Sequence, residues 1–272
     1  MKGIIIKIIS NDYFVESSNK IYKLKPRGKF KNNNTLLKVG DMVVFDKDKK
    51  VLEKVLERKN TLQRPFVSNI DMAFIVTSLK QPDFSLNLLD KFISFFEINN
   101  ITPVICITKK DLIGKNKYKE IKKVLNYYKK LGYRIIYNTN LFRIKRLIKN
   151  KIVVFTGQTG AGKSTLINKL DKSLKLQTGE ISKALGRGRH TTRYVSLMNI
   201  GKGKVVDTPG FSSLSLDNYS TEEIKSSFIE FKKYNCKYKD CNHIKEDGCN
   251  IKDNKNILKS RYENYLKFIE RG

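Results

Sequence analysis

Short apolar stretches alternate with polar turn residues through the first part of the chain. Short runs separated by turn-forming residues are typical of β-strands rather than helices. The stretches expected to form strands are residues 3–9, 13–16, 21–24, 42–45 and 51–56. Five short strands in this length suit a small closed barrel, so residues 1–62 are predicted to form an N-terminal OB-type β-barrel.

The loop between the third and fourth expected strands, residues 25–32, is basic and carries one aromatic residue, Phe30. Basic and aromatic side chains together are suited to contacts with nucleic acid. The barrel is therefore expected to bind RNA. The competing interpretation of this loop is a solvated segment whose charges serve no partner.

Beyond residue 62 the pattern changes to apolar runs that alternate with segments of helical spacing. The expected strands are 71–78, 103–108, 134–137, 151–156 and 204–206, and the expected helices are 86–98, 118–131, 141–149 and 163–170. Strands that alternate with helices predict a parallel sheet covered on both faces. Residues 63–217 are thus expected to form an α/β domain. Residues 218–272 are expected to form a third, helical domain, with helices near 221–233 and 254–270.

A glycine-rich segment lies between the strand expected at 151–156 and the helix expected at 163–170. It fits the pattern Gly-x-x-x-x-Gly-Lys-Ser, in which backbone N–H groups and the following helix N-terminus bind phosphate oxygens. Lys163 is expected to contact the terminal phosphates, Ser164 to bind Mg²⁺ and Thr165 to lie near the α-phosphate. The predicted phosphate-binding residues are Gly157, Gln158, Thr159, Gly160, Ala161, Gly162, Lys163, Ser164 and Thr165.

A second motif, Asp-Thr-Pro-Gly at residues 207–210, lies downstream of the phosphate loop. Asp207 is expected to hold Mg²⁺ through water, and the Gly210 N–H to sense the terminal phosphate. The segment 186–193, between the two motifs, has the glycines and threonines of a first switch segment, in which Thr192 is predicted to be a Mg²⁺ ligand. Taken without its neighbours, this segment reads as a basic flexible loop.

The segment Thr-Lys-Lys-Asp at residues 108–111 ends another expected strand. The Asp111 carboxylate can accept hydrogen bonds from N1 and the exocyclic amine of guanine, a pair that adenine cannot supply. The familiar guanine-binding element begins with Asn, so Thr108 is a departure that retains one polar contact. The predicted guanine-binding residues are Thr108, Lys109, Lys110 and Asp111, with Asn138, Thr139 and Asn140 closing over the base.

The order of these motifs is unusual, because the guanine element precedes the phosphate loop and in an ordinary GTPase it comes last. Sheet packing does not depend on where a chain ends, so the same strands can be joined in cyclic order. The α/β domain is therefore predicted to be a circularly permuted P-loop GTPase that binds GTP with Mg²⁺.

Three cysteines and one of the two histidines lie close together near the C-terminus. Three thiolates and an imidazole suit one Zn²⁺ ion in a closed tetrahedral site, which makes the ion structural. The predicted zinc ligands are Cys236, Cys241, His243 and Cys249. Scattered free cysteines are the alternative. Cys106 lies in the apolar run 103–107 and is expected to be a buried strand residue, and this cysteine usage indicates a reducing compartment.

The chain carries 55 Lys and Arg against 26 Asp and Glu, a net charge of +29. Such a surface attracts the phosphate backbone of RNA. A lysine-rich proteome explains the same excess, so charge alone does not establish RNA binding. The sequence has no apolar run near the ~20 residues that a bilayer requires, and a cytoplasmic monomer without membrane contact is expected.

Together these features resemble the bacterial ribosome small-subunit-dependent GTPase A family, RsgA. The resemblance rests on the order of the nucleotide motifs, on residues 187–192 (Arg-Gly-Arg-His-Thr-Thr), on residues 207–211 (Asp-Thr-Pro-Gly-Phe) and on the Cys-x₄-Cys-x-His-x₅-Cys spacing. It spans essentially the whole chain. The family implies an OB-type barrel, a circularly permuted GTPase domain and a zinc domain, with a role in late maturation of the small ribosomal subunit. GTP hydrolysis is then stimulated by that subunit, whose rRNA the protein binds.

Hydrolysis requires a positioned water, and many GTPases use a glutamine just after Asp-x-x-Gly for this purpose. Phe211 takes that place here and cannot orient water, so His190 is the nearest candidate. The residues predicted to act in catalysis are Lys163, His190, Thr191, Thr192 and Gly210. The alternative for His190 is a histidine that only packs or contacts RNA.

Two other functions fit parts of the sequence. A P-loop metabolic kinase would share the phosphate loop, but it needs an acceptor pocket and usually a lid, for which the sequence gives no sign. A passive RNA-binding zinc protein with a decayed nucleotide site would not need to keep Lys163, Ser164 and Asp207 intact.

Overall fold

The computed structural model describes residues 1–27, 36–63, 65–174, 176, 195–207 and 214–270. The chain divides into two compact units, each assembled from segments that are far apart in sequence. Unit 1 comprises Met1–Ala73, Leu141–Phe155 and Ile167–Phe211, and unit 2 comprises Phe74–Asn140, Thr156–Leu166 and Ser212–Gly272. Within the described residues, no helix is both long and apolar enough to cross a membrane.

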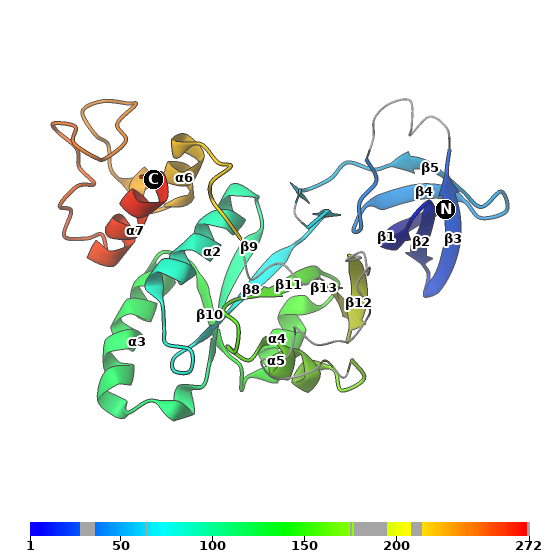
Figure 1. The fold of residues 1–272 in the computed structure, drawn as a ribbon, viewed down its shortest axis with the longest axis horizontal. Helices are drawn as coiled ribbons and strands as arrows, with labels where there is room; N and C mark the ends of the chain where they lie inside the picture. Colours follow the sequence, from blue (N-terminus) through cyan, green and yellow to red (C-terminus); the bar gives the residue numbers. More distant parts are fainter. Residues whose placement is uncertain (28–35, 64, 175, 177–194, 208–213, 271–272) are drawn as a thin grey trace, which may run out of the picture. The chain divides into compact units, whose positions relative to one another are not determined.

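Unit 1 contains a closed five-stranded barrel (Figure 1). Its strands are β1 (Lys2–Ile9), β2 (Asp12–Ser17), β3 (Lys20–Pro26), β4 (Met42–Asp46) and β5 (Val51–Val55). The hydrogen-bonded order β1-β2-β3-β5-β4 closes because β4 also pairs with β1, and all pairs except β3–β5 are antiparallel. Alternate residues of the strands fill the interior, where Ile5, Val15 and Phe45 are fully buried. The predicted OB-type barrel is confirmed.

The segment after the barrel is fixed by a buried carboxylate, Asp41. This side chain accepts hydrogen bonds from Arg58 Nε at 2.7 Å and Ser68 Oγ at 2.6 Å. The short strands β6 (Thr61–Leu62) and β7 (Val67–Ser68) pair here in antiparallel fashion. Neither strand is predicted by the sequence, since each is only two residues long.

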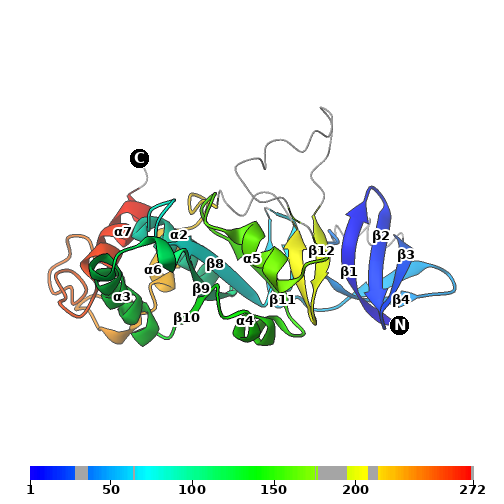
Figure 2. The same ribbon diagram turned by 90° about the horizontal axis from the view of Figure 1, so that it is seen from below.

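The remainder of unit 1 contributes the helix α4 (Leu141–Ile148) and the strands β11 (Ile152–Thr156), β12 (Ser196–Ile200) and β13 (Gly203–Asp207). The strands β11 and β13 run parallel, as expected. The sequence does not predict the strand β12, which forms an antiparallel hairpin with β13 and also lies beside β1 (Figure 2). The turn at Gly201 is short, and a short turn can join only antiparallel strands.

Unit 2 holds most of the strand β8 (Met72–Ser78), followed by α2 (Leu86–Ile98), β9 (Thr102–Thr108), the 3₁₀ turn η1 (Lys110–Leu112), α3 (Lys115–Lys130) and β10 (Arg134–Tyr137). The helix α2 begins where Ser85 Oγ accepts a hydrogen bond from Leu88 N at 3.2 Å. The strands β9 and β10 are parallel, with Ile107 opposite Tyr137. Their carboxyl ends, and the loops that follow them, therefore lie side by side.

The C-terminal part of unit 2 contains α6 (Thr221–Ser227), η2 (Phe231–Lys233) and α7 (Lys259–Ile269). The single helix predicted at 221–233 is wrong, because Phe228 leaves the helical conformation and stacks its ring on Phe231 at 5.2 Å. The helix predicted from residue 254 begins only at Lys259, since Asn254 Oδ1 instead accepts a turn hydrogen bond from Asn256 N at 2.9 Å.

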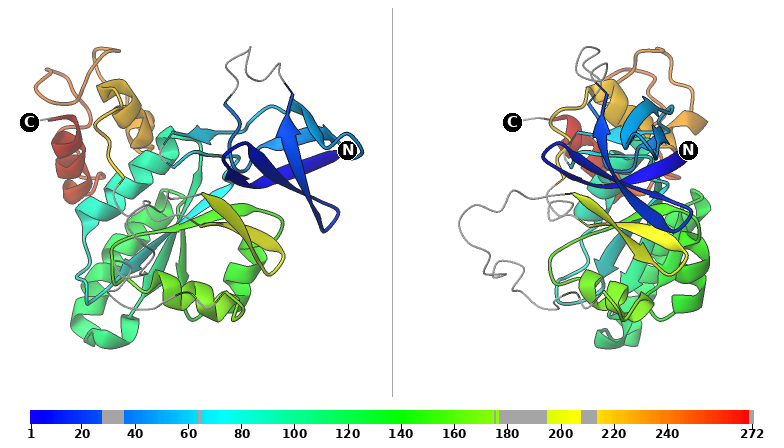
Figure 3. Two further views of the ribbon diagram at one scale, coloured as in Figure 1. Left: turned by 45° about the vertical axis from the view of Figure 1, so that its right-hand side comes forward. Right: turned by 90° about the vertical axis from the view of Figure 1, so that its right-hand side faces the viewer.

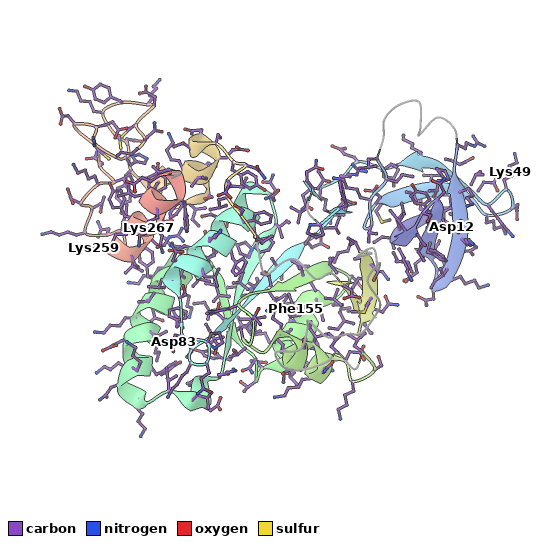
Figure 4. The ribbon with its side chains drawn as sticks, viewed as in Figure 1. Asp12, Lys49, Asp83, Phe155, Lys259 and Lys267 are labelled. Carbon is purple, nitrogen blue, oxygen red and sulfur yellow. The ribbon has the colours of Figure 1, made fainter. Side chains whose placement is uncertain are left out.

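The helices α6 and α7 pack on α2 (Figure 3). At the centre of this contact is Arg261, whose side chain is fully buried. Its Nη1 donates to Asp90 Oδ1 at 2.7 Å and its Nη2 donates to Glu230 Oε2 at 3.0 Å. The exposed side of α7 carries Lys259 and Lys267 (Figure 4). A buried ion-pair network thus fastens the C-terminal helix to the α/β part of the unit.

Candidate nucleotide and metal sites

The glycine-rich loop joins β11 to the helix α5 (Lys163–Leu170), as the motif requires. Gly157 has a φ of +134°, and a Cβ at this position would lie 2.1 Å from the carbonyl oxygen of Val76. No other residue type fits such a close approach to the neighbouring backbone. The loop is therefore held in a turn whose N–H groups can face a phosphate.

Lys163, the first residue of α5, folds its side chain back over the loop. Its Nζ donates to the carbonyl oxygens of Gly157 at 2.7 Å and Gln158 at 2.9 Å. Burial lowers the pKa of this ammonium group. Ser164 is half-buried beside it, and Thr165 is exposed. The arrangement keeps a cation at the mouth of the loop, where it can transfer its hydrogen bonds to a phosphate.

The guanine element is joined directly to this loop through Thr108. The residue is buried, and its Oγ1 donates to the carbonyl oxygen of Ala161 at 2.7 Å. Thr108 takes the place of the Asn in the familiar guanine-binding element. Its hydroxyl therefore connects the guanine element to the phosphate loop. The sequence predicted a polar contact for Thr108, but its partner in the phosphate loop was not apparent from the motif.

The other residues of the element are held separately. Lys109 has a left-handed backbone (φ +53°), and its Nζ donates to the Gln81 carbonyl oxygen. Lys110 Nζ lies 4.5 Å from the centre of the Tyr118 ring. Asp111 follows in η1 and is exposed. Three successive side chains are thus anchored, and the carboxylate next to them faces solvent.

The second predicted base-binding segment, Asn138 to Asn140, follows β10 and lies next to the guanine element. Asn138 N donates to the Ile107 carbonyl oxygen at 2.9 Å, which ties this loop to the end of β9. Thr139 and Asn140 are exposed. The structure thus brings together the phosphate loop, residues 108–111 and residues 138–140 in unit 2.

Asp207 is the last residue of β13, in unit 1. This strand runs parallel to β11, the strand that leads into the phosphate loop. Asp207 is exposed to solvent. Its carboxyl group is nevertheless partly buried, and this burial raises its pKa. The remaining predicted residues of the switch segments, His190, Thr191, Thr192 and Gly210, lie outside the described residues, as does Phe211.

The predicted zinc ligands are gathered in unit 2, with all four donor atoms within 4.8 Å of one another. His243 Nδ1 lies 3.5, 3.3 and 3.5 Å from the sulfur atoms of Cys236, Cys241 and Cys249. Zn²⁺ bonds of about 2.3 Å to sulfur and 2.0 Å to nitrogen separate tetrahedral ligands by about 3.5–3.8 Å. The donor set and its spacing therefore fit such an ion, and the cluster could hold a metal.

The backbone around this cluster is arranged by groups that the motif does not include. Glu246 accepts hydrogen bonds from Asn242 N, Ile244 N and Lys245 N at 2.7, 2.7 and 3.0 Å. Burial alone would raise the pKa of Glu246, but these backbone donors lower it to about 2. The Cys/His spacing does not include Glu246, although an acidic side chain between the ligands of a tight loop is a usable signal in the sequence.

Cys106 lies apart from the metal cluster, in β9, and is fully buried. Burial raises the pKa of its thiol to about 12, so the reactive thiolate is not formed at neutral pH. The expectation of a buried strand cysteine is confirmed.

A phosphate loop that follows the guanine element in the chain, yet is hydrogen-bonded to it, defines a circularly permuted P-loop GTPase. The chain matches the family model for the RsgA GTPase over residues 54–217 and that for the RsgA N-terminal domain over residues 2–51. It belongs to the RsgA family of GTPases.

Relatives and solved structures agree with this assignment. A protein of Latilactobacillus sakei named small ribosomal subunit biogenesis GTPase RsgA is 43% identical, over 98% of this chain and 94% of the relative. Small ribosomal subunit biogenesis GTPase RsgA 2 of Oceanobacillus iheyensis is 44% identical, over 99% of this chain and 96% of the relative. The crystal structure of YjeQ from Thermotoga maritima matches with a TM-score of 0.86 and 33% identity over 100% and 99% of the chains. That of YloQ, described as a circularly permuted GTPase, matches with a TM-score of 0.81 and 35% identity over 98% and 93%.

Proposed function

We propose that the protein acts in late maturation of the small ribosomal subunit, where it binds rRNA and hydrolyses GTP to GDP and phosphate with stimulation by the subunit. The observation that carries the nucleotide part is the hydrogen bond from Thr108 Oγ1 to the Ala161 carbonyl oxygen. It places the guanine and phosphate elements against one another despite their reversed order in the chain. The names of the relatives support the ribosomal part.

The guanine base is read by Asp111, which accepts hydrogen bonds from N1 and the exocyclic amine. Lys109 lies along the base, and residues 138–140 close over it. The N–H groups of residues 157–165 bind the phosphates together with Lys163. Joining Thr108 to the phosphate loop sets the distance between the base and phosphate ends of the nucleotide.

The residues that would hold Mg²⁺ are Ser164, Asp207 and Thr192. When bound, the ion neutralises charge on the β- and γ-phosphates. Gly210 senses the γ-phosphate through its N–H, and Thr191 belongs to the first switch segment, residues 186–193. His190 orients the attacking water when the small subunit is bound. His190→Ala should then lower stimulated turnover and leave GTP binding unchanged; unchanged stimulated turnover would remove it from the mechanism.

Residues 218–272 form a domain that holds one structural Zn²⁺ through Cys236, Cys241, His243 and Cys249. The closed set of four ligands leaves no position for a substrate. Two N–H···S bonds support thiolate ligands, from Asn250 N to Cys236 at 3.3 Å and from Lys252 N to Cys249 at 3.4 Å.

The RNA partner is engaged by the N-terminal barrel, residues 1–62, and by the C-terminal domain, which flank the GTPase domain, residues 63–217. The net charge of +29 supports a polyanionic partner. Binding to the subunit should weaken steeply with salt, because phosphate contacts release counterions. The protein acts as a cytoplasmic monomer.

The test is GTP turnover by the full-length protein, measured with and without purified small subunits. Stimulation that Lys163→Ala abolishes supports the proposal. Turnover that subunits do not change contradicts the ribosomal role. Phosphate recovered on a small-molecule acceptor, rather than as free phosphate, would instead identify a kinase, and no turnover with intact RNA binding would identify a passive RNA-binding protein.

A further inference from the structure

The residue before Asp111 is held in a way that the guanine-binding motif does not specify. Lys110 Nζ lies 4.5 Å from the centre of the Tyr118 ring and 5.5 Å from that of Tyr137. A cation within about 6 Å of an aromatic ring centre is attracted by the negative face of the ring. Lys110 therefore contacts two aromatic rings that belong to different elements.

The two tyrosines are bonded to each other as well. Their hydroxyl oxygens are 2.7 Å apart. Tyr118 lies in the first turn of α3, and Tyr137 is the last residue of β10, immediately before residues 138–140. Burial, with a contribution from the Tyr118 hydroxyl, raises the pKa of Tyr137 to about 12, so the Tyr137 hydroxyl stays neutral at physiological pH. The trio thus spans the guanine element, α3 and the second base-binding loop.

We propose that Lys110, Tyr118 and Tyr137 form a clasp that positions the guanine-binding carboxylate of Asp111 against the loop 138–140. The inference rests on the proposed function, in which Asp111 reads the base. Asp111 is exposed in the middle of a three-residue 3₁₀ turn, so its own packing does little to fix its direction. The clasp fixes the preceding residue and the beginning of the neighbouring loop at once.

The consequence is preorganisation of the base site. A loop that must be ordered when the nucleotide binds loses affinity, and a misplaced carboxylate loses one of its two hydrogen bonds to guanine. Opening the clasp should therefore weaken nucleotide binding and also reduce discrimination between guanine and hypoxanthine. Hypoxanthine lacks the exocyclic amine and offers Asp111 only its N1–H.

The experiment measures the dissociation constants of GDP and IDP for the full-length protein by competition with a fluorescent GDP analogue. Lys110→Gln should weaken GDP binding about 5- to 30-fold, as expected for the loss of two cation–π contacts. IDP binding should weaken less, so the GDP/IDP affinity ratio falls. Lys110→Arg keeps a cation over the rings and should retain GDP affinity within about 2-fold.

Lys119→Gln is the matched control, because Lys119 is an exposed lysine on α3 and its replacement changes the net charge equally. It should leave both affinities unchanged. Equal effects of Lys110→Gln and Lys119→Gln would overturn the clasp, as would a Lys110→Arg variant as weak as Lys110→Gln.

A separate variant distinguishes failure of the clasp from failure of the proposed base recognition. Asp111→Asn should exchange GDP for XDP as the preferred ligand, because xanthine has a carbonyl where guanine has its amine. Without that exchange, Asp111 does not read the base and the proposed site is wrong. If the exchange occurs while Lys110→Gln retains the wild-type GDP/IDP ratio, only the clasp is refuted.

Discussion

The buried Arg261 network predicts a large and pH-dependent loss of stability when the arginine is removed. In Arg261→Leu, the carboxylates of Asp90 and Glu230 stay buried, at 0% and 2% exposure, without their cation. Removing one partner of a buried ion pair costs about 3–5 kcal/mol. This full energetic cost should apply here, since the side chains of Arg261, Asp90 and Glu230 are all shielded from water. Lys259→Gln, on the exposed side of α7, should cost less than about 0.5 kcal/mol.

The stability lost in Arg261→Leu should vary with pH, and the pKa of Asp90 sets the direction of that variation. Burial already raises the pKa of Asp90, and loss of Arg261 removes the opposing cation. The folded variant then has an Asp90 pKa still further above that of the unfolded chain, so protonation of Asp90 favours the folded state. The free energy of unfolding that Arg261→Leu loses relative to wild type should become smaller toward pH 5 and larger toward pH 8. A deficit that does not vary with pH would show that the carboxylates are not the cause.

The assay is urea unfolding at several pH values, combined with hydrogen exchange of residues 218–270. Because Arg261 links α7 to Asp90 in α2, exchange should rise first in this C-terminal segment. Equal unfolding midpoints for Arg261→Leu and Lys259→Gln would refute the reasoning.

Three further predictions concern the sites. Gly157→Ala should abolish nucleotide binding in an equilibrium titration, because the added Cβ meets the Val76 carbonyl oxygen at 2.1 Å; retained affinity would contradict the loop geometry. Thr108→Val should weaken GTP binding about 3- to 10-fold through loss of one buried hydrogen bond, whereas Thr108→Ser should not. Cys249→Ser should leave less than half an equivalent of zinc by elemental analysis and expose the C-terminal segment to protease; full zinc content would exclude Cys249 as a ligand.

Several features of the fold could be predicted because local sequence specifies them. The helix α2 has the predicted bounds, Leu86–Ile98, since its apolar spacing agrees with the Ser85 cap at its start. The barrel follows from short alternating strands, and the cluster of metal ligands from side chains within 14 residues of one another. In each case the residues that interact are close in sequence or repeat with a fixed period.

Other features depend on partners far away in the chain. Nothing local indicates that Arg261 pairs with Asp90, or that Thr108 binds the carbonyl oxygen of Ala161. The strand β12 was missed because its five residues alternate weakly and take their pairing from β13 and β1. Likewise the motif at residues 108–111 includes Lys110, but it does not indicate that the rings of Tyr118 and Tyr137 lie next to its ammonium group.

The central claim is that Asp111 and Lys163, although reordered along the chain, bind the two ends of one guanine nucleotide. It is tested most directly by a crystal structure of the protein with a non-hydrolysable GTP analogue and Mg²⁺. The account predicts one bound nucleotide, with the Asp111 carboxylate on guanine N1 and N2 and Lys163 on the β- and γ-phosphates. A nucleotide whose base lies away from Asp111 while its phosphates occupy the loop at Lys163 would contradict it.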